Sequence, residues 1–244
     1  MRTAFLVCLL ASVSCLPVSS FALARNAKDN SLNEIVYKPQ PPLSDPKANY
    51  PGLNPSETVL PKGYVFQPGR RPLSEPMIFD QDVAITLRDG TVIYADVYRP
   101  VGDTKVPAIV SYGPAGKRGQ NNMLDIMGGK DGVPERMGIP RDATSGMQAY
   151  LSQDPAEWVP HGYAIVNVDM RGVYMSGGDL DYFGPRNGED GAEVIEFIAR
   201  QPWSTGKVGM SGNYWYGLTQ WFVAAQRPPH LAAIAPWDAG SDIY

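Results

Sequence analysis

The stretch that decides the fold is Lys207–Gln226, KVGMSGNYWYGLTQWFVAAQ. It opens with a short apolar strand pattern over Lys207–Ser211 and then turns at Gly212. A helix pattern follows over Gly217–Gln226, and Pro228 ends it. The segment therefore predicts a strand and a helix joined by a tight turn, which is a building unit of an α/β sheet.

Outward from this unit, further apolar runs predict buried strands with helices between them. Helical spacing predicts a helix over Glu189–Arg200, with Asn187 as its N-cap and with Glu189 and Asp190 in its first turn. Alternating residues on both sides of Asp89-Gly90 predict a leading hairpin. The remaining predicted strands are 106–112, 163–168 and 231–235, and residues 116–157 are predicted to be irregular. The fold class is α/β, with parallel inner strands.

The N-terminus has the pattern of a secretory signal over residues 1–24. Arg2 is followed by an apolar run that is too short to span a membrane, and Ala22-Leu23-Ala24 is a cleavage pattern. We therefore expect a secreted or periplasmic protein, free of the membrane after cleavage; an uncleaved anchor is the alternative. Residues 25–79 are rich in proline and predict an arm that is either ordered on the surface or a disordered linker.

Composition excludes several classes of function. The chain has 244 residues, 43% of them hydrophobic, and a net charge of −4, which argues against a nucleic-acid partner. Both cysteines, Cys8 and Cys15, lie in the predicted signal. A mature chain without cysteine has no disulfide, thiolate nucleophile or zinc–thiolate site. We expect no metal and no cofactor.

Over residues 80–244 the chain resembles the N-terminal part of the Xaa-Pro dipeptidyl-peptidase-like and cocaine-esterase-like serine hydrolases. The resemblance rests on five segments in the same order as in the family. These are ITLRDGTVIYADVYRP (Ile85–Pro100), SYGPAGKRG (Ser111–Gly119), HGYAIVNVDMRGVYMSGG (His161–Gly178), EDGAEVIEFIARQPWSTGKVGMSGNYWYGLTQW (Glu189–Trp221) and PPHLAAIAPW (Pro228–Trp237). It implies a partial α/β-hydrolase domain and a serine nucleophile acting on ester, amide or Xaa-Pro peptide bonds.

At the implied catalytic positions this sequence departs from the family. The family turn is G-x-S-Y/W-x-G, so its nucleophilic serine corresponds to Tyr214, and the backbone N–H of Trp215 corresponds to an oxyanion donor. The second donor, a tyrosine in a P-Y-G-K segment, corresponds to Ala115. The acid and histidine of the family lie further along than the residues that follow Gly217 here. We therefore expect a truncated, catalytically impaired member that lacks both.

Other polar and aromatic residues have structural interpretations that we favour over catalytic ones. Ser211 could be a shifted nucleophile, but it lies at the end of a strand. His161 and His230 are expected to be structural, Asp169 and Arg171 to form a salt bridge or loop clamp, and Glu189 and Asp190 to be helix acids and not a metal pair. The aromatic residues of the turn could line a sugar or peptide site, but we expect them to pack beneath it; they are Tyr214, Trp215, Tyr216 and Trp221.

Three functions remain open from the sequence. The chain is a segment of a serine hydrolase, a non-catalytic descendant that binds a small acyl or peptide ligand in the vestigial pocket, or a remnant without function. Thermal melting separates a folded binder from a remnant. The predicted strand at 231–235 leaves an open apolar sheet edge, which favours self-association.

Overall fold

A computed structural model describes residues 52–118, 138 and 140–240. The predicted signal peptide and the first part of the proline-rich arm lie outside the described residues. Within the described part, no helix is long and apolar enough to cross a membrane.

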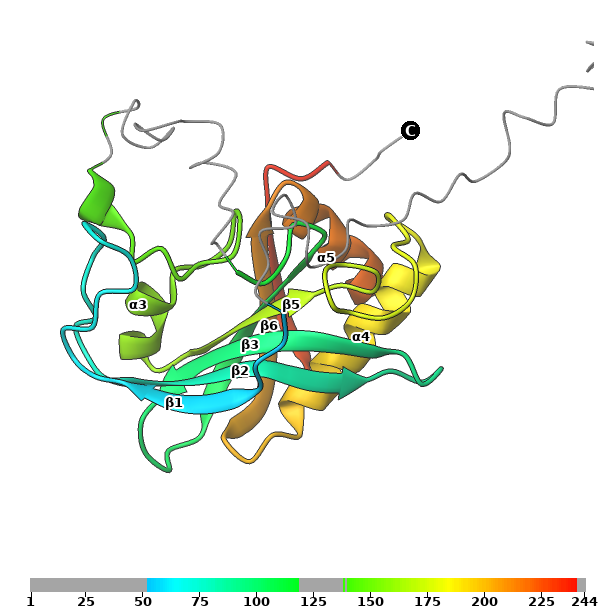
Figure 1. The fold of residues 1–244 in the computed structure, drawn as a ribbon. Helices are drawn as coiled ribbons and strands as arrows, with labels where there is room; N and C mark the ends of the chain where they lie inside the picture. The colour runs from blue at the N-terminus through cyan, green and yellow to red at the C-terminus, as the bar shows by residue number, and fades with distance from the viewer. Residues whose placement is uncertain (1–51, 119–137, 139, 241–244) are drawn as a thin grey trace, which may run out of the picture. The chain divides into compact units, whose positions relative to one another are not determined.

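The described residues form a mixed sheet of seven strands with helices on both of its faces (Figure 1). The strands are β1 (Ser56–Leu60), β2 (Met77–Thr86), β3 (Val92–Pro100), β4 (Val106–Gly113), β5 (Ala164–Asp169), β6 (Ser204–Asn213) and β7 (Leu231–Trp237). The helices are α3 (Pro155–Trp158), α4 (Pro185–Ala199) and α5 (Trp215–Ala225), with 3-10 turns at Arg141–Ala143 and Val159–His161.

The strand order is β1-β2-β3-β5-β4-β6-β7. Strands β5, β4, β6 and β7 run parallel to one another, whereas β1, β2 and β3 form an antiparallel extension, in which β3 pairs antiparallel with β5. The α/β fold with parallel inner strands and a leading hairpin is therefore confirmed.

Two cores cover the two faces of the sheet. On one face, α4 and α5 pack on the parallel strands, with Val166, Val194 and Ile195 completely buried. On the other face, residues of the arm and of α3 surround Tyr98, whose ring stacks on Phe79 at a centroid distance of 4.6 Å. Tyr98 and Ile165 lie on the face beneath α3. Because residues two apart in a strand share a face of the sheet, Asp96 and Asn167 lie on that face as well.

The described part of the proline-rich arm is ordered on the sheet. Its residues Ser56–Leu60 form β1, which pairs with β2 in the register Ser56↔Gln81 to Leu60↔Met77. Leu60 and Leu73 are buried in the core beneath α3. The sequence pattern predicts no strand before residue 82. The prediction therefore missed β1 and the first half of β2.

Helix α4 begins earlier than the sequence pattern indicates. Gly184 is its N-cap and Pro185 occupies its first turn, where a missing N–H costs nothing. The prediction that Asn187 caps the helix is wrong, because Asn187 lies inside the helix and is 3% exposed. Glu189 and Asp190 consequently lie beyond the first turn, and their partners are arginine side chains.

Candidate active site

The turn between β6 and α5 carries Tyr214 at its crest. Tyr214 is the N-cap of α5 and has φ 52° and ψ −111°, a conformation that a residue with a side chain rarely adopts. Its N–H donates to the carbonyl of Trp237 (3.0 Å), and its own carbonyl accepts from Gly217 and Leu218 (2.9 and 2.8 Å). The side chain of Tyr214 is 52% exposed. The structure thus places a phenol, open to solvent, on the tight turn.

Two glycines permit this turn. A Cβ on Gly212 would lie 2.4 Å from the Cβ of Tyr216, and a Cβ on Gly217 would lie 2.6 Å from the Cβ of Ala239. Both distances are far inside van der Waals contact. A side chain at Gly212 would push α5 away from β6, and one at Gly217 would push α5 away from the segment that follows β7.

Ser211 lies one step before the turn and its hydroxyl is already engaged. It accepts a hydrogen bond from Nε2 of Gln153 (2.7 Å), and the hydroxyl of Ser111 donates to Oε1 of the same amide (3.1 Å). The two histidines have other partners: Nδ1 of His161 lies 2.7 Å from the carbonyl oxygen of Glu157, and Nδ1 of His230 lies 2.8 Å from a carboxylate oxygen of Glu196. Their structural interpretation is supported.

The loop after β4 carries Ala115 and is held from two sides. The hydroxyl of Tyr216 donates to the carbonyl of Gly116 (3.0 Å), and the N–H of Lys117 donates to Oδ1 of Asp169 (2.6 Å). Gly116 has φ +92°, and a Cβ there would lie 2.2 Å from Cε2 of Tyr174. Ala115 is partly exposed on this loop, and its methyl side chain cannot donate a hydrogen bond.

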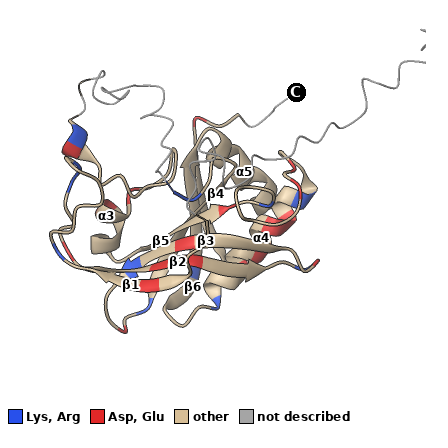
Figure 2. Cartoon of the chain, in the orientation of Figure 1, with Lys and Arg blue, Asp and Glu red and all other residues tan. Residues whose placement is uncertain are grey.

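A buried ionic cluster lies beneath the same loop. The ammonium of Lys117 contacts Asp82 and lies 3.4 Å from Asp96 and 3.6 Å from Asp169. Arg118 adds contacts of 2.5 Å to Asp82 and 2.8 Å to Asp96. Although burial opposes charge, the hydrogen bonds from Lys117 and from the Asn54 N–H lower the pKa of Asp82 to about 2. Figure 2 shows acidic residues on β1, β2 and β3, where these strands run side by side.

The remaining charged candidates form a clamp on α4. The guanidinium of Arg171 binds both oxygens of Asp190 (2.6 and 3.0 Å) and one of Asp89 (2.8 Å). Arg88 binds Asp190 as well (2.9 Å) and also contacts Glu189. Arg171 is thus a loop clamp as expected, while Asp169 pairs with Lys117. In the described part of the chain, no three His, Cys, Asp or Glu side chains are grouped to hold a metal ion.

The aromatic side chains of the turn divide into two groups. Tyr216 is 1% exposed and packs beneath the turn, as predicted. Tyr214 and Trp221 are 52% and 41% exposed, so the prediction that they pack beneath it is wrong. The ring of Trp215 lies between those of Tyr214 and Tyr182, at centroid distances of 5.6 and 6.4 Å. This exposed row borders the turn on the solvent side.

A cavity of about 380 Å³ lies beside the turn. Gly212 and Asn213 of β6 form one side of it, and Trp237 of β7 borders it. Leu151 also lines it, and its carbonyl accepts from the Asn213 N–H (3.0 Å). The volume of this cavity falls within the range of small-molecule sites.

The sequence pattern of the X-Pro dipeptidyl-peptidase (S15) family matches residues 89–244. The chain belongs to the S15 family. This match includes the turn at Tyr214 and the loop at Ala115. The S15 family is a family of hydrolases, and the observed strand order and helix placement agree with an α/β-hydrolase fold.

Individual relatives agree with membership in the S15 family. Cocaine esterase from Rhodococcus sp. (strain MB1 Bresler) is 30% identical over 167 residues, covering 67% of this chain and 24% of the esterase. A CocE/NonD family hydrolase from Staphylococcus aureus matches in structure with a TM-score of 0.63 and 34% identity, over 81% of this chain and 33% of that one. The chain spans about a quarter of the length of the curated relatives it matches.

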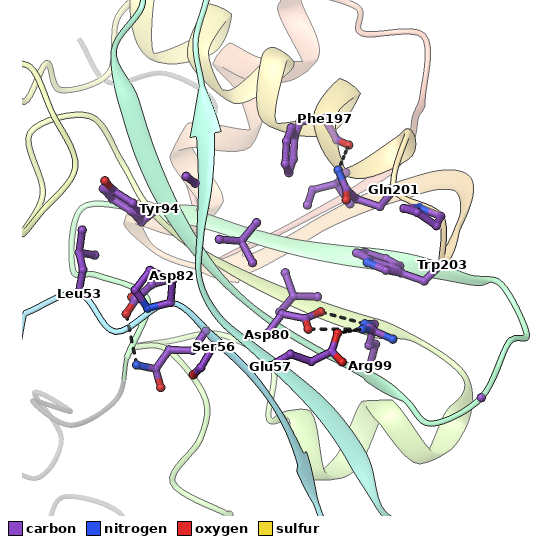
Figure 3. Close-up of a pocket in the computed structure, with 18 of the residues that line it drawn as sticks. Leu53, Ser56, Glu57, Asp80, Asp82, Tyr94, Arg99, Phe197, Gln201 and Trp203 are labelled. Atoms are coloured by element: carbon purple, nitrogen blue, oxygen red, sulfur yellow. Dashed lines mark hydrogen bonds and ion pairs between the residues drawn. The ribbon is translucent and has the colours of Figure 1, made fainter.

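A second cavity, of about 800 Å³, lies between β1–β3 and the C-terminal end of α4 (Figure 3). On its sheet side Arg99 pairs with Asp80 and Glu57, both at 2.9 Å, and Phe197 and Trp203 border it on the helix side. Tyr214, Trp215 and Ala115, the positions that the S15 resemblance assigns to catalysis, line neither this cavity nor the one beside the turn. The cavity beside the turn adjoins those positions, because Gly212 and Asn213, which directly precede Tyr214, line it.

Proposed function

We propose that this chain is an exported S15-family protein whose hydrolysis of ester, amide or Xaa-Pro peptide bonds is impaired at the turn. The observation that carries the proposal is Tyr214, a half-exposed phenol at the N-cap of α5. A serine hydrolase needs a hydroxyl that a neighbouring imidazole activates. Loss of that nucleophile costs on the order of 10⁶ in rate.

The loop that carries Ala115 supports the same proposal. The backbone of this loop is held by Tyr216 and Asp169, while the side chain at position 115 is a methyl group. Loss of one oxyanion donor costs about 10²–10³ in rate. Position 214 thus lacks the serine hydroxyl, and position 115 lacks the tyrosine hydroxyl, that the family resemblance assigns to catalysis. The backbone around both positions is retained.

The test is a pre-steady-state assay of the purified full chain with p-nitrophenyl acetate. We expect no burst of p-nitrophenol in the wild type and the same progress curve for Tyr214→Phe. A burst that Tyr214→Phe abolishes would overturn the proposal, since it would make the phenol a nucleophile. Ser211→Ala is the matched control: a burst lost only in that variant would assign the nucleophile to Ser211 and equally contradict us.

The cavity beside the turn favours a second candidate function, the binding of a small acyl or peptide ligand. Trp158, Trp237 and Leu151 offer apolar contacts. Much of the remaining lining is polar or charged, and includes Arg71, Thr144, Ser152, Gln153, Asp154, Glu157 and Asn213. Polar groups beside apolar side chains can fix the orientation of a ligand. The cavity needs neither the serine nor the oxyanion donor, so binding can persist without catalysis.

Calorimetric titration with N-acetylproline amide checks this binding function. We expect saturable binding to the wild type and a loss of at least about tenfold in affinity for Ala143→Trp, whose indole fills the cavity beside the turn. Ala84→Trp is the control, because Ala84 lines only the cavity at β1–β3. Binding that survives Ala143→Trp but is lost in Ala84→Trp would place the ligand in the cavity at β1–β3 and refute the assignment.

A further inference from the structure

Among the described residues, the buried cluster beneath the Ala115 loop has more carboxyl groups than cationic groups. In the part of the chain that the structure describes, it holds three carboxyl groups, from Asp82, Asp96 and Asp169, and two cationic groups, from Lys117 and Arg118. The three carboxyl groups and the ammonium are 0% exposed. An uncompensated charge buried in this way is expensive, and the usual remedy is a proton on one carboxyl group.

The geometry identifies which carboxyl group that is. Asp82 and Asp96 each contact the guanidinium of Arg118, at 2.5 and 2.8 Å. Asp169 has no contact with Arg118 among these pairs, and its closest approach to the Lys117 ammonium is 3.6 Å. Its Oδ2 is buried without a hydrogen-bond partner among the described residues. Of the three, Asp169 has the weakest compensation for a negative charge.

We infer that Asp169 is the member of this cluster that carries a proton. The inference does not rest on the proposed function. Its experiments measure the titration of a carboxyl group, so they succeed or fail independently of any ester or ligand assay.

The surroundings of Asp169 agree with a neutral form. The ionisable groups around it are Lys117 and Arg118 from the loop after β4, Asp96 from β3 and the phenol of Tyr216 from α5, with Asp82 of β2 beyond the Lys117 ammonium. Burial raises the pKa of Asp169 to about 7, against the opposing attraction of Lys117. Asp96 raises this pKa further, because like charges disfavour ionisation.

The direction of the pH effect on stability follows from linkage. The folded chain keeps a proton on Asp169 up to a pKa of about 7, whereas a carboxyl group in the unfolded chain loses it near the ordinary pKa of 3.8. Between these values the folded state binds the extra proton, so stability falls as the pH rises and levels off above the folded pKa. One proton corresponds to about a tenfold increase in the unfolding constant per pH unit.

The direct test is carboxyl NMR of the full chain with ¹³C-labelled aspartate. We expect one aspartate to stay protonated at about pH 6, to titrate near neutral pH, and to disappear from the spectrum of Asp169→Asn. Full ionisation of every aspartate by about pH 5 would overturn the inference without any variant. Asp96→Asn provides a sharper comparison, because it leaves two carboxyl groups against two cations; the titration of Asp169 should then move to lower pH.

Urea denaturation checks the same proton through stability. The unfolding constant of the wild type should rise with pH between about pH 4 and pH 7, and Asp169→Asn should lose this part of the pH dependence. Equal pH dependence of the unfolding constant in both proteins would contradict the inference.

Discussion

Lys117→Met is expected to lower the free energy of unfolding by about 3–5 kcal/mol, as measured by urea denaturation at neutral pH. The substitution keeps much of the side-chain volume and removes the ammonium that lies within 4 Å of all three carboxyl groups, Asp82, Asp96 and Asp169. With Asp169 neutral, Asp82 and Asp96 would then share the guanidinium of Arg118. One buried negative charge in the cluster would be uncompensated, which is strongly destabilising.

The matched control for this substitution is Lys62→Met. Lys62 forms an ion pair with Glu75 at 3.3 Å, but both side chains are more than half exposed. Solvent screens such a pair, so its loss should leave the unfolding free energy nearly unchanged. Similar effects of the two substitutions would show that the cluster beneath the Ala115 loop is hydrated and contributes no special stability.

Tyr216→Ala should destabilise the chain by about 3–5 kcal/mol, the cost of removing a fully buried aromatic side chain. The ring of Tyr216 fills the space above Gly113, where an added Cβ would lie 2.7 Å from it, and also contacts Gly212. The cavity left behind would lie between α5 and the loop after β4. Urea denaturation monitored by tryptophan fluorescence measures the change in the free energy of unfolding.

Tyr216→Phe separates the ring from its hydroxyl. It should cost only about 1 kcal/mol, because it removes the single hydrogen bond to the carbonyl of Gly116. If both variants lose the same stability, the hydrogen bond and not the packing holds this part of the site, and the expectation for the ring is wrong.

The amino-acid pattern was sufficient to predict the strands of the parallel half of the sheet, but the prediction that the last of them is buried is wrong, because no residue of β7 is buried. Strands β4, β5 and β7 are continuous apolar runs bounded by turn residues, and the unit from β6 to α5 is marked by its glycines. Such signals are local, so they can be recognised without knowledge of the partners. The position of Tyr214 on the tight turn follows from the same spacing.

What the sequence could not predict depends on tertiary partners. Strand β1 has four exposed residues and no apolar alternation, and it is a strand only because β2 pairs with it. The first turns of α4 contain Gly188, a weak helix former, but a Cβ there would lie 2.3 Å from the carbonyl oxygen of Phe222 in α5. Glycine at this position serves the packing of two helices, which outweighs its local preference.

The ionic cluster could not be predicted from the sequence for the same reason. Asp82, Asp96 and Asp169 lie on three different strands, and Lys117 lies on a loop. One signal was present: Asp96 lies within the apolar strand β3, on the same face as Tyr98. A buried acid in a strand implies a cationic partner, although it does not tell which one.

The tight turn at Tyr214 has a consequence for how such a protein can arise. Its backbone depends on Gly212 and Gly217 and on the carbonyl of Trp237, whereas the side chain at the crest is half exposed to solvent. Serine and tyrosine codons can differ by a single base. A single-base mutation can therefore exchange one residue for the other without a change in the backbone of the turn.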